Sequence, residues 1–108
     1  MRALSIRQPY VEQILTGEKK IEFRSKNTLI RGKFYIYSSK TPAFTATYGR
    51  DVDELPKGLI VGTAELVDCT FVDDSAGPYY EWHLKNPKRL KRPLKPKNKP
   101  QPVWFNPF

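Results

Sequence analysis

The amino-acid sequence predicts an α+β fold: a small, closed or nearly closed β-barrel of about five to six strands, with one short N-terminal helix. Short stretches rich in Val, Ile, Tyr, Phe and Thr alternate with turn residues along the chain, which is typical of such a barrel. One segment, near the N-terminus, has apolar residues at helical spacing. With 108 residues, 13% of them aromatic, the chain has enough apolar material for the core of one domain.

The N-terminal part of the chain is expected to form a strand followed by the helix. Residues 3–6 form the short strand. The helix begins at Gln8-Pro9, and Gly17 ends it with a positive φ. The apolar stripe of this helix consists of Tyr10, Val11, Ile14 and Leu15.

Residues 20–24 are expected to form a half-buried strand, because their side chains alternate strictly between apolar and charged. Ile21 and Phe23 share the predicted core face of this strand. The opposite face, which is predicted to be solvated, carries Lys20, Glu22 and Arg24.

Three further strands are expected in the rest of the chain, over residues 33–38, 59–72 and 79–84. Gly62 marks a bulge or a close backbone approach within the second of them. A second short helix over residues 43–48 is one interpretation of the ambiguous segment that follows residue 38. The core face of the last strand consists of Tyr80, Trp82 and Leu84.

The positive charge of the chain, +8 overall, is concentrated at its C-terminal end. Residues 1–84 carry 11 basic and 11 acidic residues, whereas residues 85–108 carry 8 basic residues, no acidic residue and six of the ten prolines. Such a run of positive charge is typical of a segment that binds a polyanion, most commonly nucleic acid. The alternative is a solvated tail that aids solubility. The prolines disfavour an amphipathic membrane helix. The tail residues expected to contact phosphates are Lys88, Arg89, Lys91, Arg92 and Lys95.

The end of this basic segment is expected to return to the body of the domain. Val103, Trp104 and Phe105 are apolar, and leaving them in water would be costly. We therefore expect residues 1–108 to form one domain, whose basic, Pro-rich segment 85–108 packs back through Trp104.

Cysteine and histidine usage excludes several classes of site. Cys69 is the only cysteine and His83 the only histidine, so neither an intrachain disulfide nor a His/Cys zinc tetrad can form. We expect no metal and no cofactor, a buried structural thiol at Cys69, and an outward-facing His83. The chain shows neither the h-region of a signal peptide nor ~20 consecutive apolar residues, so we expect a cytoplasmic monomer without membrane contact.

The segment 17–24 carries the residue types of a ligand site. Glu22 and Arg24 are two positions apart on a strand and so project from the same face, and Lys19 leaves the turn just before them. Cations beside a carboxylate can hold a phosphate or polarise a carbonyl, while the carboxylate accepts an N–H or acts as a base. The alternative is that these residues are charged only because this face of the strand is exposed to solvent.

Other candidate residues follow from their positions in the expected fold. Arg7 and Gln8 lie at the start of the helix, where free N–H groups favour anions, and the alternative for Arg7 is a surface ion pair. Ser38 and Ser39 end a strand, where they either bind a phosphate or sugar or satisfy local backbone groups. The aromatic residues that either stack on bases or pack in the core are Tyr35, Tyr37, Tyr79 and Tyr80.

The segment Gly17-x-Lys19-x-x-Glu22-x-Arg24 resembles the G-x-K-x-x-E-x-R signature of the ASCH domain family, a member of the PUA-like superfamily. Further blocks resemble the family in the same order along nearly the whole chain: residues 4–10, 36–39 and 60–67, and the ending from 82 to 104. The resemblance implies a barrel with a cleft beside the first helix, into which the signature residues point, and an RNA-related role.

Two functions follow from this resemblance. The first is an RNA- or nucleotide-binding module whose ligand residues are Arg7, Gln8, Lys19, Glu22, Arg24, Ser38 and Ser39. The second is a small hydrolase, either a nucleoside amidohydrolase or a ribonuclease, with Lys19 and Glu22 as catalytic residues. The amidohydrolase type has threonine at the position of Glu22, so this chain departs from it there. A protein-interaction domain, with the Pro/Lys tail as the ligand, is a third alternative.

Overall fold

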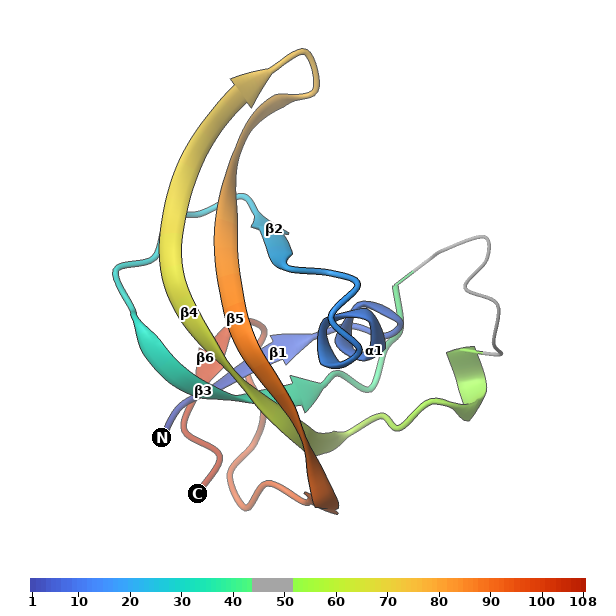
Figure 1. Cartoon of the computed structure of the whole chain (residues 1–108). Helices are drawn as coiled ribbons and strands as arrows, with labels where there is room; N and C mark the ends of the chain where they lie inside the picture. Colours follow the sequence, from blue (N-terminus) through green and yellow to red (C-terminus); the bar gives the residue numbers. More distant parts are fainter. Residues whose placement is uncertain (44–51) are drawn as a thin grey trace.

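The computed structural model describes residues 1–43 and 52–108, and in this part of the chain it consists of a six-stranded sheet and one short α-helix (Figure 1). The helix is α1 (Tyr10–Leu15), and a 3₁₀ turn covers Val52–Glu54. The second helix predicted over residues 43–48 lies, apart from Ala43, outside the described residues. The strands are β1 (Ala3–Ile6), β2 (Ile21–Arg24), β3 (Gly32–Ser38), β4 (Leu59–Asp74), β5 (Gly77–Leu94) and β6 (Trp104–Phe105).

The strands form one sheet in the order β2-β5-β4-β3-β1-β6. β1 and β3 are parallel, and all other neighbours are antiparallel. β2 and β6 form the two edges, and no backbone ladder joins them within the described ranges, so the predicted closed or nearly closed barrel is not confirmed. The sheet is strongly curved, because the long strands β4 and β5 arch side by side from the hairpin between them to the opposite end (Figure 1).

Side chains, not backbone ladders, connect the two sides of this open sheet. Arg24 on β2 donates a hydrogen bond from Nη2 to the carbonyl oxygen of Ser5 on β1, at 2.9 Å. Trp104 on β6 stacks on Trp82 of β5, with ring centroids 5.8 Å apart and planes 10° from parallel. The curvature therefore brings each edge strand within side-chain reach of the opposite side of the sheet, β2 of β1 and β6 of β5.

β5 is longer than the sequence predicted. It runs from Gly77 to Leu94, so the basic residues up to position 92 lie in a strand paired with β4, and the prediction that the last long strand ends at Leu84 is wrong. The prolines indicated a break, but Pro87 and Pro93 fall where the β4–β5 register shifts. At such irregularities the inserted residues leave the ladder, so the missing N–H of proline costs no ladder hydrogen bond.

Two glycines permit the packing of α1 on the sheet. Gly17 follows the helix with a φ of 86°, which confirms the predicted stop. A Cβ on Gly62 would lie 2.6 Å from Cδ2 of Leu15 and 2.6 Å from the carbonyl oxygen of Lys88. This contact confirms the predicted close approach, because any side chain at position 62 would push α1 or β5 away.

The main core lies between α1 and the sheet. Trp82 is its largest fully buried side chain, and its indole Nε1 donates a 3.0 Å hydrogen bond to the carbonyl oxygen of Lys26. The other buried members of this cluster are Leu4, Ile6, Val11, Ile14, Phe34, Ile36, Val61, Ala64, Leu66 and Leu84. In residues 1–43 and 52–108, no helix is both long enough and apolar enough to cross a membrane.

Candidate functional site: a cleft between the edges of the sheet

The alternation of β2 faces the opposite way from the prediction. Glu22 is only 6% exposed, whereas Phe23 is 54% exposed. In the ladder Glu22 lies opposite Trp82, so the carboxylate shares the face that carries the core. The alternation of β2 indicated a solvent-exposed carboxylate, because alternation alone does not show that Arg24 and Lys19 pair with Glu22 and so allow its burial.

Two cations compensate the buried carboxylate of Glu22. Arg24 donates a hydrogen bond from Nη2 to Oε2 of Glu22 at 2.9 Å, and the same nitrogen reaches the carbonyl of Ser5. Nζ of Lys19 lies 3.7 Å from Oε1 of Glu22. The three charged signature side chains thus converge on one point beside β1.

Aromatic rings surround both cations. Nζ of Lys19 lies 5.2 Å from the ring centroid of Tyr10 and 4.7 Å from that of Phe23. The guanidinium of Arg24 lies 5.5 Å from the ring centroid of Trp82. Cation–π contacts of this kind favour positive charge at these positions and restrict the side chains, so the cluster is preorganised.

Next to this cluster lies a cleft of about 650 Å³, within the usual size range for a small-molecule site. It opens where β1 and β2 are not joined by a ladder, and the chain from 99 to 102 forms another wall. The residues that line it are Ser5, Arg7, Tyr10, Glu22, Phe23, Arg24, Tyr37, Ser39, Lys40, Thr41, Lys99, Pro100, Gln101 and Pro102.

The chemistry of the cleft wall combines positive charge, aromatic surface and hydroxyl groups. Glu22 is the one carboxylate that lines it among the described residues, against four cations: Arg7, Arg24, Lys40 and Lys99. Burial raises the pKa of Tyr37 above its ordinary value of 10.0, so its hydroxyl stays neutral near pH 7. Such a wall can bind an anion, stack a flat ring and accept N–H groups.

The wall formed by residues 99–102 was missed by the sequence analysis. Oγ of Ser5 donates a hydrogen bond to the carbonyl oxygen of Gln101 at 2.5 Å, and the backbone N–H of Ser5 donates to the carbonyl oxygen of Val103 at 2.9 Å. These bonds place Lys99 beside the cleft. The apolar residues at 103–105 were a usable signal, since a chain that returns to the sheet there must bring the preceding residues with it.

Gln8 and Ser38 were candidate ligand residues, but their polar side chains face the carbonyl oxygen of Pro56. Nε2 of Gln8 donates to it at 3.0 Å, and Oγ of Ser38 donates to it at 2.5 Å. Oε1 of Gln8 accepts a hydrogen bond from the backbone N–H of Glu12, which occupies one of the free donors expected at the helix start. Both side chains are fully buried and do not line the cleft, whereas Arg7 and Ser39 do.

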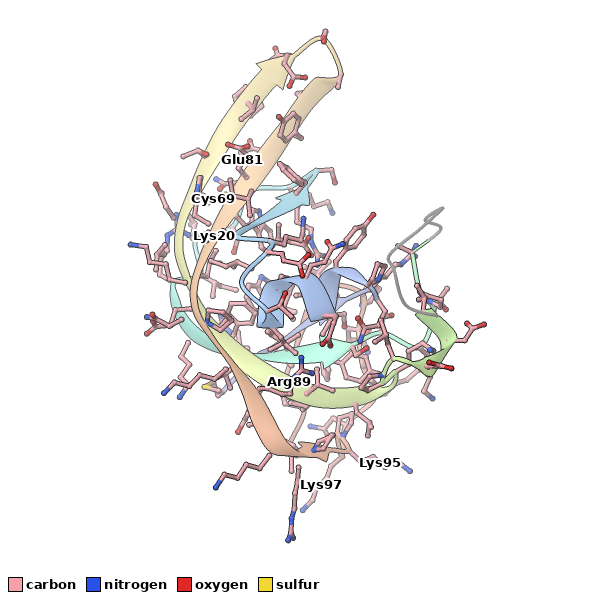
Figure 2. The ribbon with its side chains drawn as sticks, turned by 45° about the vertical axis from the view of Figure 1, so that its right-hand side comes forward. Lys20, Cys69, Glu81, Arg89, Lys95 and Lys97 are labelled. Carbon is pink, nitrogen blue, oxygen red and sulfur yellow. The ribbon has the colours of Figure 1, made fainter. Side chains whose placement is uncertain are left out.

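The basic residues proposed to contact phosphates lie away from the cleft. Arg89 forms a bidentate pair with Glu12 of α1, with N–O distances of 2.6 and 3.2 Å. It therefore anchors the helix to β5 instead of extending freely into solvent. Figure 2 shows Lys95 and Lys97 at the end of the molecule opposite the β4–β5 hairpin. The five tail candidates, none of which lines the cleft, are Lys88, Arg89, Lys91, Arg92 and Lys95.

His83 and Cys69 lie near the middle of the β4–β5 hairpin. Nε2 of His83 lies 2.9 Å from Oγ1 of Thr70, so this hydrogen bond occupies one ring nitrogen. Cys69 is half-buried. Within the described part of the chain, no three His, Cys, Asp or Glu side chains come together in a way that could hold a metal ion.

An open, curved six-stranded sheet with a short helix and a cation-lined cleft between β1 and β2 is typical of a PUA-like β module. The chain belongs to the ASCH domain family, whose sequence profile matches residues 4–105. This match confirms the resemblance that the signature segment indicated.

The comparison with curated proteins finds relatives that are much longer. Activating signal cointegrator 1 from Homo sapiens and from Mus musculus is in each case 34% identical over 80 residues. The matched region is 61% of this chain but only 14% of those proteins. The chain therefore corresponds to a small part of each relative.

Solved structures share the fold. ASCH from Zymomonas mobilis superposes with a TM-score of 0.70 at 14% sequence identity, covering 96% of this chain and 85% of that chain. A point mutant of the same protein gives a TM-score of 0.63, covering 87% and 74% of the two chains. At this identity the likeness shows the fold alone.

Proposed function

We propose that this ASCH module binds RNA or a free nucleotide, and that the cleft holds one nucleotide. The observation that carries the proposal is the composition of the cleft, in which four cations, aromatic rings and hydroxyls surround a single buried carboxylate among the described residues. A nucleotide has the matching parts: a phosphate, a flat base and a sugar with hydroxyl groups.

Glu22 is the group suited to recognise the base. An ionised carboxylate has about four acceptor positions. In Glu22, Arg24 occupies one of them at 2.9 Å, and Nζ of Lys19 lies farther away at 3.7 Å. The remaining lone pairs can accept the N–H of an exocyclic amino group. The rings of Tyr10 and Phe23 offer stacking surfaces beside it. We therefore expect a preference for cytosine or adenine over uracil.

We expect the phosphate of the bound nucleotide to contact the cations that line the cleft. Arg7 and Lys40 line the cleft, and Lys99 lines it from the segment before β6. Ser39 and Thr41 place hydroxyl groups on the same wall, where they can bind a phosphate or sugar oxygen.

The surroundings of Lys19 favour binding over hydrolysis. A lysine that acts as nucleophile or base must bring its Nζ to the reacting atoms of the substrate. Nζ of Lys19 instead lies 3.7 Å from Glu22 and 4.7 and 5.2 Å from two ring centroids, so it is already engaged by side chains of the protein. This arrangement suits a fixed positive charge that orients Glu22 and the ligand. Hydrolysis remains the outcome that a turnover assay would reveal.

The base preference can be measured by isothermal titration with CMP, AMP and UMP. CMP and AMP are expected to bind about tenfold more tightly than UMP. Glu22→Gln is expected to reduce this difference, because a neutral amide oxygen accepts a hydrogen bond more weakly than a carboxylate does. Arg7→Ala should weaken all three nucleotides alike. Lys91→Ala is the matched control, since it removes the same charge outside the cleft.

Two results would contradict this proposal. One is a Lys91→Ala variant that loses as much mononucleotide affinity as Arg7→Ala, which would make the binding unspecific. The other is turnover of N4-acylated cytidine or of single-stranded RNA that disappears in Lys19→Ala, which would support the hydrolase instead.

The basic part of β5 and the segment after it are proposed to add phosphate contacts for longer RNA. Replacing Lys88, Lys91 and Lys95 together with alanine should lower the affinity for single-stranded oligonucleotides of any sequence. The slope of log affinity against log salt should flatten by about 0.7 for each lost contact. The affinity for a mononucleotide should change little. An unchanged salt slope would exclude this role of the tail.

A further inference from the structure

A second cavity, of about 410 Å³, lies next to the charged cluster, because Lys19 lines it. The aliphatic part of its floor consists of Ile14, Ile21, Val67 and Leu84. Lys19 connects the two sites, because it lines this second cavity while its Nζ lies 3.7 Å from Glu22 in the cleft wall. We name this cavity the Lys20 pocket, after the exposed lysine on its wall.

Two irregularities of the β4–β5 ladder shape the Lys20 pocket. The register shifts between Leu66 and Asp68, which leaves Val67 as an extra residue on β4. It shifts again on β5 at Asn86, which has a φ of 53° and is the one non-glycine residue with positive φ among those described. Bulges re-aim side chains and are over-represented next to functional sites. Here both extra residues line the same cavity.

The charge of the Lys20 pocket is positive. Lys19, Lys20 and Lys85 line it, and no carboxylate does so in the described part of the chain. Lys20 and Lys85 are exposed, and the backbone N–H of Leu84 donates to the carbonyl oxygen of Lys20 at 2.9 Å, which fixes the loop against β5. Figure 2 shows Lys20 in this loop, beside β5. An apolar floor under a cationic rim suits a flat ring that carries a phosphate.

We propose that the Lys20 pocket is a second nucleotide subsite, which holds the neighbouring nucleotide of an RNA strand whose first nucleotide lies in the cleft. The base lies on the apolar floor, and the linking phosphate lies near Lys19, Lys20 and Lys85. This inference rests on the proposed function of the cleft. It makes the preferred ligand a strand of at least two nucleotides, and Lys19 the residue between the two subsites.

The test compares a 5′-phosphorylated mononucleotide with the 5′-phosphorylated dinucleotide that contains it, by isothermal titration at constant salt. The wild-type chain is expected to bind the dinucleotide about tenfold more tightly, because a second base is buried on the apolar floor and the linking phosphate lies near the lysines. Val67→Trp should fill the Lys20 pocket without altering any charge, and Val67 is 44% exposed, so a larger side chain can be accommodated. This variant should lose the tenfold advantage and keep its mononucleotide affinity.

A second pair of variants separates local from general charge effects. Lys20→Ala should reduce the advantage of the dinucleotide more than Lys91→Ala, which removes the same charge on a distant part of β5. In NMR spectra, the amide signals of Val67 and His83 should shift with the dinucleotide and not with the mononucleotide.

Two failures are distinguishable. If the wild-type chain does not bind the mononucleotide, the proposed function of the cleft is wrong, and this inference fails with it. If the mononucleotide binds but the dinucleotide binds no more tightly and leaves Val67 and His83 unshifted, the second subsite alone is overturned.

Discussion

Replacing Trp104 with alanine is expected to lower the free energy of unfolding by about 3 kcal/mol, at the lower end for a tryptophan because this side chain is only partly buried. Its ring stacks on Trp82, with centroids 5.8 Å apart, and meets Phe34 edge-on at 5.5 Å. These contacts hold β6 at the edge of the sheet. Thermal unfolding should show a fall in Tm of about 15 °C for a chain of this size.

The same substitution should also affect the cleft. Residues 99–102 form one of its walls and reach the sheet through bonds from Ser5 to Gln101 and Val103, just before Trp104. Without the tryptophan, this segment loses its neighbouring anchor. Mononucleotide affinity is therefore expected to fall even at temperatures where the rest of the sheet stays folded.

Trp104→Phe is the matched control for this prediction. The indole Nε1 of Trp104 is buried with no hydrogen-bond partner in the described part of the chain, so phenylalanine removes an unpaired donor while keeping a ring. The expected loss is about 1 kcal/mol or less. Equal destabilisation by alanine and phenylalanine would show that ring packing is not what holds β6.

Glu22→Ala is the second substitution with a large expected effect. It leaves the partly buried cations of Arg24 and Lys19 without the carboxylate that pairs with them at 2.9 and 3.7 Å. Removing one member of a buried ion pair typically costs about 3 kcal/mol, because the remaining charge is uncompensated. Denaturant unfolding should show a lower midpoint with an unchanged slope.

A double-mutant cycle checks that prediction. Arg24→Met removes the guanidinium, so Glu22→Ala should cost less in that background than in the wild-type chain, since one orphaned cation is then absent. Strictly additive free energies would mean that the two side chains do not interact. Glu22→Gln, which keeps the shape of the side chain, tests base preference without the loss of volume.

Much of the secondary structure could be predicted from local pattern. The apolar stripe after Pro9 and the glycine at 17 indicated a helix and its end, and the structure has α1 over Tyr10–Leu15 with Gly17 at a φ of 86°. The β-rich run from residue 59 appears as β4. These features depend on neighbouring residues, whose steric and hydrogen-bonding preferences act locally.

β2 and β5 show where local pattern is insufficient. The strand predicted over residues 20–24 is present as β2, but the predicted orientation of its two faces is wrong. Glu22 faces the core because Arg24 and Lys19 pair with its carboxylate there. The prolines after Leu84 indicated that the C-terminal segment of the chain does not pair with another strand. They are accommodated because bulges against β4 occur at the same positions, and such a register depends on both strands.

By itself, then, the sequence determined the family through its signature segment, the β-rich composition, the early helix and the concentration of positive charge in its last 24 residues. Only the tertiary structure decided that the sheet stays open, that Gln8 and Ser38 face Pro56, and that Lys99 reaches the cleft. The reason is physical. Propensity and periodicity act over a few residues, whereas burial of a charge and formation of a cleft depend on groups that lie far apart in sequence and meet only when the sheet curves.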